Sequence, residues 1–334
     1  MNVLFVGGTG TISSACARLA VARGITVTFF NRGKSARHPA PDGVEVLHGD
    51  IGDSASARSA LGERQFDVVV QWAAFLPAQA KLDVELFRSR TRQYVFISSA
   101  SAYHKPPRSL PVTESTPLHN PYWQYSRDKM ACEDILLQAY RSKQFPVTIV
   151  RPSHTYDAAL LPVHGGWTVV DRMRRGLPVV VHGDGTSLWT LTHNDDFARG
   201  LVGLLGHSAA LGEAFHITSD EALTWNAIHE IVGRAAGARP NLVHVPSDLI
   251  AAFDPAWGAG LLGDKAHSMI FDNTKIKRLV PDYRAVIPYS RGAEEQVAWY
   301  DADPRRRVVD AALDERIEGI LRGYERAWPR AASA

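Results

Sequence analysis

The fold of this chain is decided near its start, by the stretch Val3-Leu4-Phe5-Val6-Gly7-Gly8-Thr9-Gly10-Thr11-Ile12-Ser13. Four consecutive apolar residues predict a strand that is buried on both faces. The glycines that follow allow a tight turn, and apolar residues then recur at helical spacing as far as Ala20. A glycine-rich loop between a buried strand and a helix N-terminus is typical of a site for a dinucleotide pyrophosphate, because free N–H groups and the positive end of the helix dipole face that loop. The expected contacts are Gly7, Thr9, Gly10, Thr11 and Ile12.

Strands and helices continue to alternate through the first half of the chain. Apolar runs predict further strands at 26–30, 44–47, 68–70, 94–97 and 147–150. Helical patterns at 58–61, at 78–88 and from Pro121 onward lie between them. Strands that are apolar on both faces and alternate with helices indicate a parallel sheet covered on each side. We therefore expect an α/β protein with a Rossmann doubly wound parallel sheet.

The residue composition changes after Pro152. Pro, Gly, Trp and His become frequent, and short strands at 179–181, 188–192 and 214–218 mix with a helix at 194–205. This pattern predicts a smaller C-terminal substrate domain that is interleaved with the first. The expected division gives residues 1–152, plus about 193–219, to the dinucleotide-binding domain, and residues 153–192 and 220–330 to the substrate-binding domain.

Composition excludes several classes of protein. The 334 residues are 45% apolar and 22% charged, which are ordinary globular values and exclude a disordered chain or a coiled coil. The 37 basic and 35 acidic side chains nearly cancel, so no global field attracts nucleic acid or a membrane. There is no apolar run of membrane-spanning length and no signal peptide, so we expect a cytoplasmic protein. Cys16 and Cys132 are expected to be buried, reduced thiols, and no spacing indicates a metal site.

Residues at the ends of three predicted strands extend the dinucleotide site. Asp50 and Ile51 follow the third strand, and Ala73-Ala74 follow the fourth. Ligands of doubly wound sheets bind at these carboxyl ends. The second strand ends in Asn31-Arg32, where an acidic residue would bind the ribose of NAD and a guanidinium can pair with a 2′-phosphate. The sequence therefore favours NADP over NAD, with Lys34 as a weaker second charge.

A tyrosine and a lysine are placed for acid–base chemistry. Tyr125 and Lys129 stand four residues apart on one face of the predicted long helix, and Ser99 follows the fifth strand. A phenol is a poor base at neutral pH, but an adjacent ammonium and a positively charged nicotinamide lower its pKa. A hydroxyl on the opposite side would hold the substrate oxygen.

Together these motifs resemble the extended short-chain dehydrogenase/reductase family, the NAD-dependent epimerase/dehydratase group. The resemblance covers roughly residues 1–285. It implies Ser99, Tyr125 and Lys129 as the catalytic triad, with Tyr125 carrying the proton and Lys129 binding the nicotinamide ribose. The motifs that carry it are Gly7-Gly8-Thr9-Gly10, Gly49-Asp50-Ile51, Ala73-Ala74, Ser98 to Tyr103, Tyr125 to Lys129, Arg151 to Tyr156 (with Pro152 and Ser153 as further cofactor contacts), Gly183-Asp184-Gly185 and His193 to Asp196.

Two departures from the family pattern bear on the reaction. Ala100-Ser101 stand where several family dehydratases carry an acidic pair, which disfavours a dehydratase. Trp189 stands where nucleotide-sugar enzymes often carry an arginine for the diphosphate, which speaks against such a substrate and suits stacking on a sugar. The expected reaction is hydride transfer at a secondary alcohol or ketone of a sugar-like substrate, as reductase or epimerase. Candidate substrate contacts are Ser101, His104, Trp123, His154, Tyr156 and Trp189.

A third departure supplies a hypothesis from another class. Only nineteen residues separate Ala74 from Tyr94, where the family usually has a long helix of its dimer bundle. We therefore expect a monomer, or a homodimer with a reduced helix-bundle interface. A shortened segment is also similar to the branch of chloroplast stem-loop RNA-binding proteins. The alternative is thus a dinucleotide-fold protein that binds RNA through Arg172, Arg174 and Arg175, against which the intact triad and the near-neutral charge speak.

Overall fold

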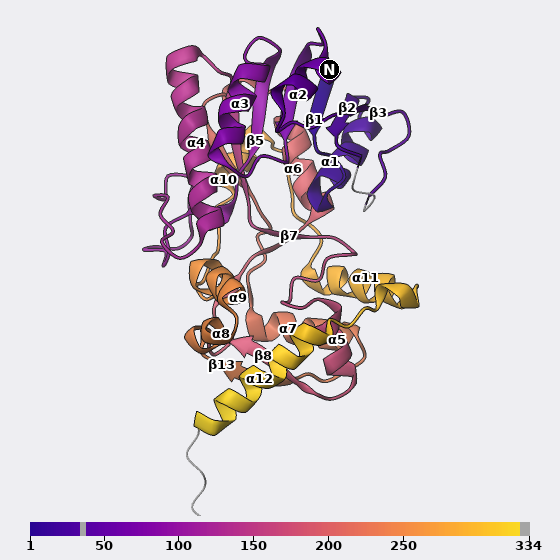
Figure 1. The fold of residues 1–334 in the computed structure, drawn as a ribbon, viewed down its shortest axis with the longest axis vertical. Coiled ribbons are helices and arrows are strands. Elements are labelled where there is room, and N and C mark those ends of the chain that lie inside the picture. Colours follow the sequence, from indigo (N-terminus) through magenta and orange to yellow (C-terminus); the bar gives the residue numbers. More distant parts are fainter. Residues whose placement is uncertain (34–37, 328–334) are drawn as a thin grey trace, which may run out of the picture.

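A parallel sheet of seven strands forms the centre of the first part of the molecule (Figure 1). The computed structural model describes residues 1–33 and 38–327, and Lys34 lies outside them. The strand order β3-β2-β1-β4-β5-β6-β11 reverses direction at β1, so this is the Rossmann doubly wound arrangement that the sequence predicted. The strands are β1 (Asn2–Val6), β2 (Thr26–Asn31), β3 (Glu45–His48), β4 (Phe66–Gln71), β5 (Thr91–Ile97), β6 (Val147–Pro152) and β11 (Ala214–Ile217).

Helices cover both faces of this sheet because successive strand residues point to opposite sides. Val3 and Phe5 of β1 pack on one side with α1 (Thr11–Ala22), α6 (Asn194–Leu204) and α10 (Thr274–Leu279). Leu4 and Val6 pack on the other side with α2 (Ser54–Leu61), α3 (Pro77–Phe87) and α4 (Gln124–Lys143). The apolar runs of the sequence are therefore strands with two covered faces.

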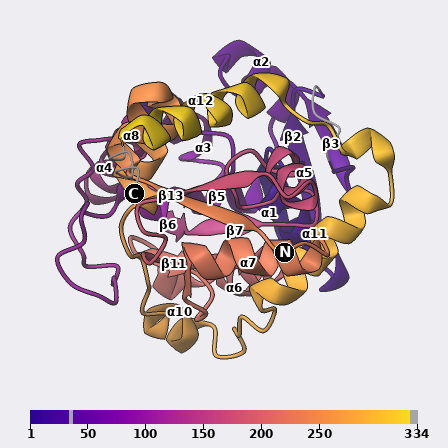
Figure 2. The same cartoon turned by 90° about the horizontal axis from the view of Figure 1, so that it is seen from below.

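The rest of the chain forms a smaller part beneath the carboxyl ends of the strands, and β7 lies between the two parts (Figure 1). Seen from below, α7, α11 and α12 surround its centre (Figure 2). Three two-stranded sheets contribute to it: β7 with β10, β9 with β12, and β8 with β13. The elements are β7 (His154–Tyr156), α5 (Trp167–Arg174), β8 (Pro178–His182), β9 (Leu188–Trp189), β10 (Leu191–His193), β12 (Leu223–Thr224), α7 (Trp225–Ala235), β13 (Asn241–Val245), α8 (Ser247–Phe253), α9 (Pro255–Gly260), α11 (Tyr289–Asp301) and α12 (Ala311–Ala327).

Two predicted elements differ from the structure. The strand expected at 188–192 is broken at Thr190, because β9 pairs with β12 whereas β10 pairs with β7. The long helix begins at Gln124 and not at Pro121, because the Asn120 side-chain oxygen accepts hydrogen bonds from the N–H groups of Tyr122 and Trp123 (both 3.2 Å) and turns the chain before the helix starts. The proposed division into domains stays a prediction.

Two further features of the fold concern the cysteines and the length of the apolar helices. Cys16 and Cys132 are buried and free of disulfides. Burial raises the pKa of the Cys132 thiol to about 11, so it stays protonated at neutral pH. Within residues 1–33 and 38–327, no helix is both long and apolar enough to cross a bilayer.

Candidate functional site

The glycine loop between β1 and α1 has a backbone that only glycine adopts readily. Gly7 and Gly8 have φ values of 105° and 121°. A Cβ atom at Gly8 would lie 2.8 Å from the Phe29 ring, so the loop can run this close to the sheet only without a side chain. Gly10 precedes the first turn of α1, and its N–H donates to the Ser13 hydroxyl at 2.9 Å. The remaining first-turn N–H groups have no partner within the helix and are available to an anion.

Beside this loop lies a cavity of about 160 Å³, which we call the Arg32 groove. It runs past the ends of β1, β2 and β4, and the Asn31 side-chain oxygen braces its rim by accepting the Gly33 N–H at 2.9 Å. Its shape and its glycine lining fit the adenosine end of a dinucleotide. The lining residues are Val6, Gly7, Thr9, Phe30, Asn31, Arg32, Gly33, Gly49, Ile51 and Ala73.

Most of the predicted cofactor residues lie in or next to this groove. Six of them line it: Gly7, Thr9, Asn31, Arg32, Ile51 and Ala73. Gly10, Thr11 and Ile12 form the adjoining start of α1. Asp50 is outside the lining, and its carboxylate accepts the Gly52 N–H at 2.9 Å. Arg32 is exposed, and no carboxylate of the described residues lies within 4 Å of it.

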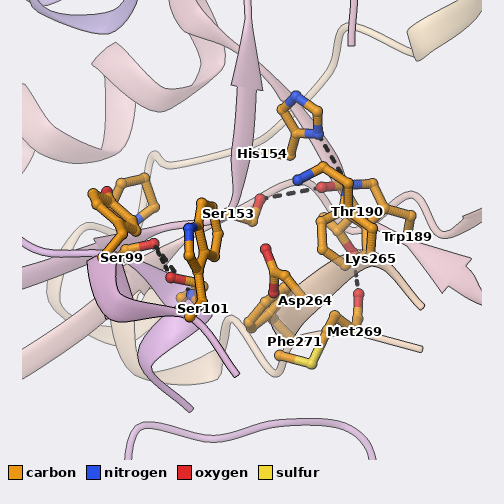
Figure 3. Close-up of a pocket in the computed structure, with 14 residues that line it drawn as sticks. Ser99, Ser101, Ser153, His154, Trp189, Thr190, Asp264, Lys265, Met269 and Phe271 are labelled. Atoms are coloured by element: carbon orange, nitrogen blue, oxygen red, sulfur yellow. Dashed lines mark hydrogen bonds between the residues drawn. The ribbon is translucent and has the colours of Figure 1, made fainter. Parts of the chain in front are cut away.

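A second cavity, of about 230 Å³, opens at the ends of β5 and β6 (Figure 3). We call it the Tyr125 cavity. Segments from distant parts of the chain meet there: the turn after β5, the start of α4, β7, β9 and the chain between 264 and 271. The lining residues are Ser99, Ala100, Ser101, Trp123, Tyr125, Pro152, Ser153, His154, Trp189, Thr190, Asp264, Lys265, Met269 and Phe271.

Ser99 and Tyr125 are neighbours in this cavity. The Ser99 hydroxyl lies 2.9 Å from the Ser101 hydroxyl, which in turn accepts a hydrogen bond from Ser126 at 2.8 Å (Figure 3). Burial raises the pKa of the Tyr125 phenol, a hydrogen bond with Ser99 partly offsets this, and the Asp264 carboxylate raises it further. The phenol is therefore protonated at neutral pH. The lowering that the sequence predicts requires a positively charged nicotinamide beside the phenol, and it stays a prediction.

Lys129 lies one helical turn beyond Tyr125 and is buried behind it. Its ammonium donates to the backbone oxygens of Ala74 at 2.7 Å and Ile97 at 2.8 Å. The nitrogen is 5.9 Å from the centre of the Tyr125 ring. Burial lowers the pKa of Lys129 to about 8. The two carbonyl bonds fix the ammonium at the ends of β4 and β5.

Four of the six predicted substrate residues line the Tyr125 cavity: Ser101, Trp123, His154 and Trp189. Trp189 donates its ring N–H to His154 Nδ1 at 3.1 Å, and burial lowers the pKa of His154 to about 3. His154 is thus neutral, with its proton on Nε2. The other two candidates lie elsewhere. Tyr156 is fully buried against Tyr289, and His104 contacts the Pro106 carbonyl outside the cavity.

The residues that close the cavity from the C-terminal side were not predicted from the sequence. Asp264 and Lys265 belong to a single π-helical turn, Leu261–Lys265, and the Asp264 carboxylate points into the cavity (Figure 3). Asn120 fixes this turn, because its amide donates to the carbonyls of Ser101 at 2.8 Å and Gly263 at 2.6 Å. The only available signal was the polar Asp-Lys pair after Leu261-Leu262, and it has no characteristic spacing.

The three arginines of the RNA hypothesis already have carboxylate partners. Arg172 is buried and bonds Asp314 and Glu318 of α12, both at 2.5 Å. Arg174 bonds Asp301 at 2.6 Å, and Arg175 bonds Asp171 at 3.2 Å. This cluster therefore offers no free guanidinium stripe to a phosphate backbone.

The chain is similar to several known proteins. The family model described as NAD dependent epimerase/dehydratase family matches residues 3–218. A 2′-dehydrokanamycin reductase of Streptomyces kanamyceticus is 27% identical over 96% of this chain and 90% of its own length. The chloroplast stem-loop binding protein of 41 kDa b of Arabidopsis thaliana is 28% identical over 73% of this chain and 65% of its own length. Among solved structures, a UDP-glucose 4-epimerase of Bifidobacterium longum in complex with NAD⁺ and UDP superposes with a TM-score of 0.74 at 18% identity, covering 92% of this chain and 100% of that one.

Proposed function

The chain belongs to the NAD dependent epimerase/dehydratase family, and we propose that it is an NADP-preferring reductase that acts on a ketone of a sugar or sugar-like substrate. The observation that carries the proposal is the meeting of Ser99 and Tyr125 in one cavity, with Lys129 fixed one turn behind. Reduction is preferred to epimerisation because Arg32, and no carboxylate, stands at the end of β2. A reductase among the relatives supports the same choice.

The residues of the cavity would divide the chemistry as follows. A bound nicotinamide would supply the hydride. Tyr125 would donate its phenolic proton to the carbonyl oxygen, a role that suits a phenol whose pKa burial raises. Ser99 would hold the same oxygen by a hydrogen bond, and His154 would offer its Nε2 proton to a second substrate oxygen. Lys129 would place its ammonium beside the nicotinamide ribose.

The wall of the cavity suits a sugar ring. Trp123 and Trp189 provide aromatic faces, and Ser101, Asp264 and Lys265 provide polar groups around them. Aromatic faces pack against the C–H side of a sugar while polar groups bind its hydroxyls. Trp189 in place of a diphosphate-binding arginine favours a substrate that is not linked to a nucleotide.

Removal of the Tyr125 hydroxyl tests the proposal. With NADPH and a keto-sugar that is turned over, Tyr125→Phe should lower kcat by about 10²-fold or more, because proton transfer is lost. NADPH affinity should stay nearly unchanged, as measured by fluorescence titration. Tyr122→Phe is the matched control, since Tyr122 is 47% exposed and lies outside the Tyr125 cavity. A Tyr125→Phe protein with a near-wild-type kcat would contradict the assignment.

A further inference from the structure

Lys265 lines the Tyr125 cavity, and its ammonium is not paired with a carboxylate of the described residues. Within residues 1–33 and 38–327, its ammonium has neither a hydrogen-bond acceptor nor a carboxylate within 4 Å. The contacts that the structure gives it are aromatic: the nitrogen lies 5.6 Å from the centre of the Trp123 ring and 5.8 Å from that of Trp189. Cation–π contacts of this kind stabilise an ammonium weakly and do not neutralise its charge.

The neighbouring carboxylate is already occupied. Asp264 bonds the Lys105 ammonium at 3.0 Å, and the Lys105 side chain is fully buried. Lys105 also contacts the Met269 sulfur at 3.1 Å, which holds it under the cavity floor. Two ammonium groups thus lie near one carboxylate. Burial lowers the pKa of the Lys265 ammonium, the Asp264 carboxylate opposes this, and the Lys105 ammonium adds to it. His154 contributes no charge at neutral pH, because burial lowers its pKa to about 3.

A further cavity, of about 670 Å³, adjoins the Tyr125 cavity and shares Trp123, His154 and Lys265 with it. We call it the Trp257 cavity. The other charged side chains that we describe in this lining have partners. Arg316 bonds Asp254 at 2.7 Å, and the Asp310 carboxylate accepts the Leu313 N–H at the positive end of α12. Among the described residues that line either cavity, Lys265 is therefore the cationic side chain with no carboxylate within 4 Å, and it lies where the two cavities meet.

We propose that Lys265 is a substrate-binding residue that pairs with an anionic group, a carboxylate or a phosphate, carried by the sugar-like substrate. The inference rests on the proposed function and deepens it, because it names an acidic sugar as the substrate class. A half-buried ammonium in a cavity wall gains from an anion, because water screens the pair less there than at an open surface. Asp264, which pairs with Lys105, lies next to Lys265 in the cavity wall. Its carboxylate repels an anion that binds away from Lys265.

The test uses four sugars that differ in charge but share one ring. Glucuronate carries a carboxylate, glucose 6-phosphate a phosphate, glucose no charge and glucosamine a positive charge. Their dissociation constants are measured by calorimetry on wild-type protein saturated with NADP⁺, at constant ionic strength. At least one acidic sugar should bind about tenfold or more tightly than glucose, and the better of the two identifies the group as carboxylate or phosphate. Glucosamine should bind no better than glucose.

Three variants and one control locate the effect. Lys265→Met and Lys265→Gln should remove the preference for the acidic sugar, and Lys265→Arg should keep part of it. Lys81→Met, which removes an exposed lysine of α3, should keep all of it. Unchanged NADP⁺ affinity and melting temperature show that the variants fold.

Equal binding of charged and neutral sugars, a preference that survives in Lys265→Met, or no measurable binding of either acidic sugar would each overturn the inference. Those outcomes are distinct from a failure of the proposed function. If the protein reduces a neutral keto-sugar and this turnover depends on Tyr125, the proposed reductase function stands and only the anion site at Lys265 is contradicted.

Discussion

Arg32 is the residue on which the choice of cofactor depends. It follows Asn31 at the end of β2, lines the Arg32 groove and has no carboxylate within 4 Å in the described part of the chain. A 2′-phosphate beside its guanidinium gains a charge-assisted hydrogen bond of about 1.5–3 kcal/mol, which corresponds to a roughly tenfold to hundredfold preference for NADP. Arg32→Ala should therefore weaken NADP binding by that factor and leave NAD binding nearly unchanged. Fluorescence titration of both cofactors measures the effect.

Arg23→Ala is the control for this experiment, because Arg23 is exposed at the other end of α1. It should change neither affinity. If wild-type protein binds NAD as tightly as NADP, and Arg32→Ala weakens both equally, the guanidinium only stacks on adenine. An NAD protein would then favour epimerisation, in which the ketone is rotated in place, over net reduction.

At the scale of single elements, the sequence predicted what local pattern controls. The apolar run at β1 predicted a strand correctly because both faces of β1 are covered. The four-residue spacing of Tyr125 and Lys129 predicted that both lie on one side of α4. Asp264 and Lys265 could not be predicted in the same way. They reach the cavity through tertiary contacts, such as the Asn120 bond to Gly263, that join segments 143 residues apart. Tyr156 shows the reverse case, since its motif is intact but its ring is packed in the core.

The helix α5 decides between the enzyme and the RNA hypothesis. Its arginines hold α11 and α12 through Asp301, Asp314 and Glu318 instead of facing solvent freely. We expect short stem-loop RNA to bind only weakly at about 0.15 M salt, with a Kd of roughly 10⁻⁴–10⁻⁶ M as for non-specific contacts. A gel-shift titration at two salt concentrations measures this. Tight, salt-resistant binding that Arg174→Ala and Arg175→Ala abolish would reverse the ranking.

At the scale of the whole molecule, an aromatic wall joins the Tyr125 cavity to the smaller part of the fold. Trp189 lies 5.5 Å from Trp225, ring centre to ring centre, and three histidines pack against these two rings: His154 at 6.3 Å from Trp189, and His182 and His229 at 4.9 Å and 6.3 Å from Trp225. Two of the three use their ring protons inside the protein, since His182 donates to the Lys265 carbonyl at 3.0 Å and His229 to that of Trp225 at 2.8 Å. The wall therefore depends on neutral imidazoles.

Acid should weaken this wall and the fold with it. Burial lowers the pKa of His154 to about 3 and those of His182 and His229 to about 4, whereas an unfolded histidine titrates near 6.5. Between those values the unfolded chain binds up to three more protons at these residues, so the free energy of unfolding rises with pH and is lost as pH falls from 6.5 toward 4. Burial of Asp83 acts in the opposite direction, because it raises that pKa to about 7 and makes the folded chain bind one more proton.

The balance of three protons against one gives the last prediction. Through these four groups the free energy of unfolding should fall by up to about 3 kcal/mol per pH unit between pH 6 and 5, as followed by urea unfolding with tryptophan fluorescence. Burial also lowers the pKa of His164 to about 4, which adds to the fall. His229→Gln should lower this slope by up to about one proton, while His48→Gln, at an exposed histidine, should leave it unchanged. A slope that is flat in the wild type, or equal in wild type and His229→Gln, would show that the imidazoles are protonated in the folded protein. The wall would then be positively charged near pH 5, and Lys265 would not be the only cation that an acidic substrate meets.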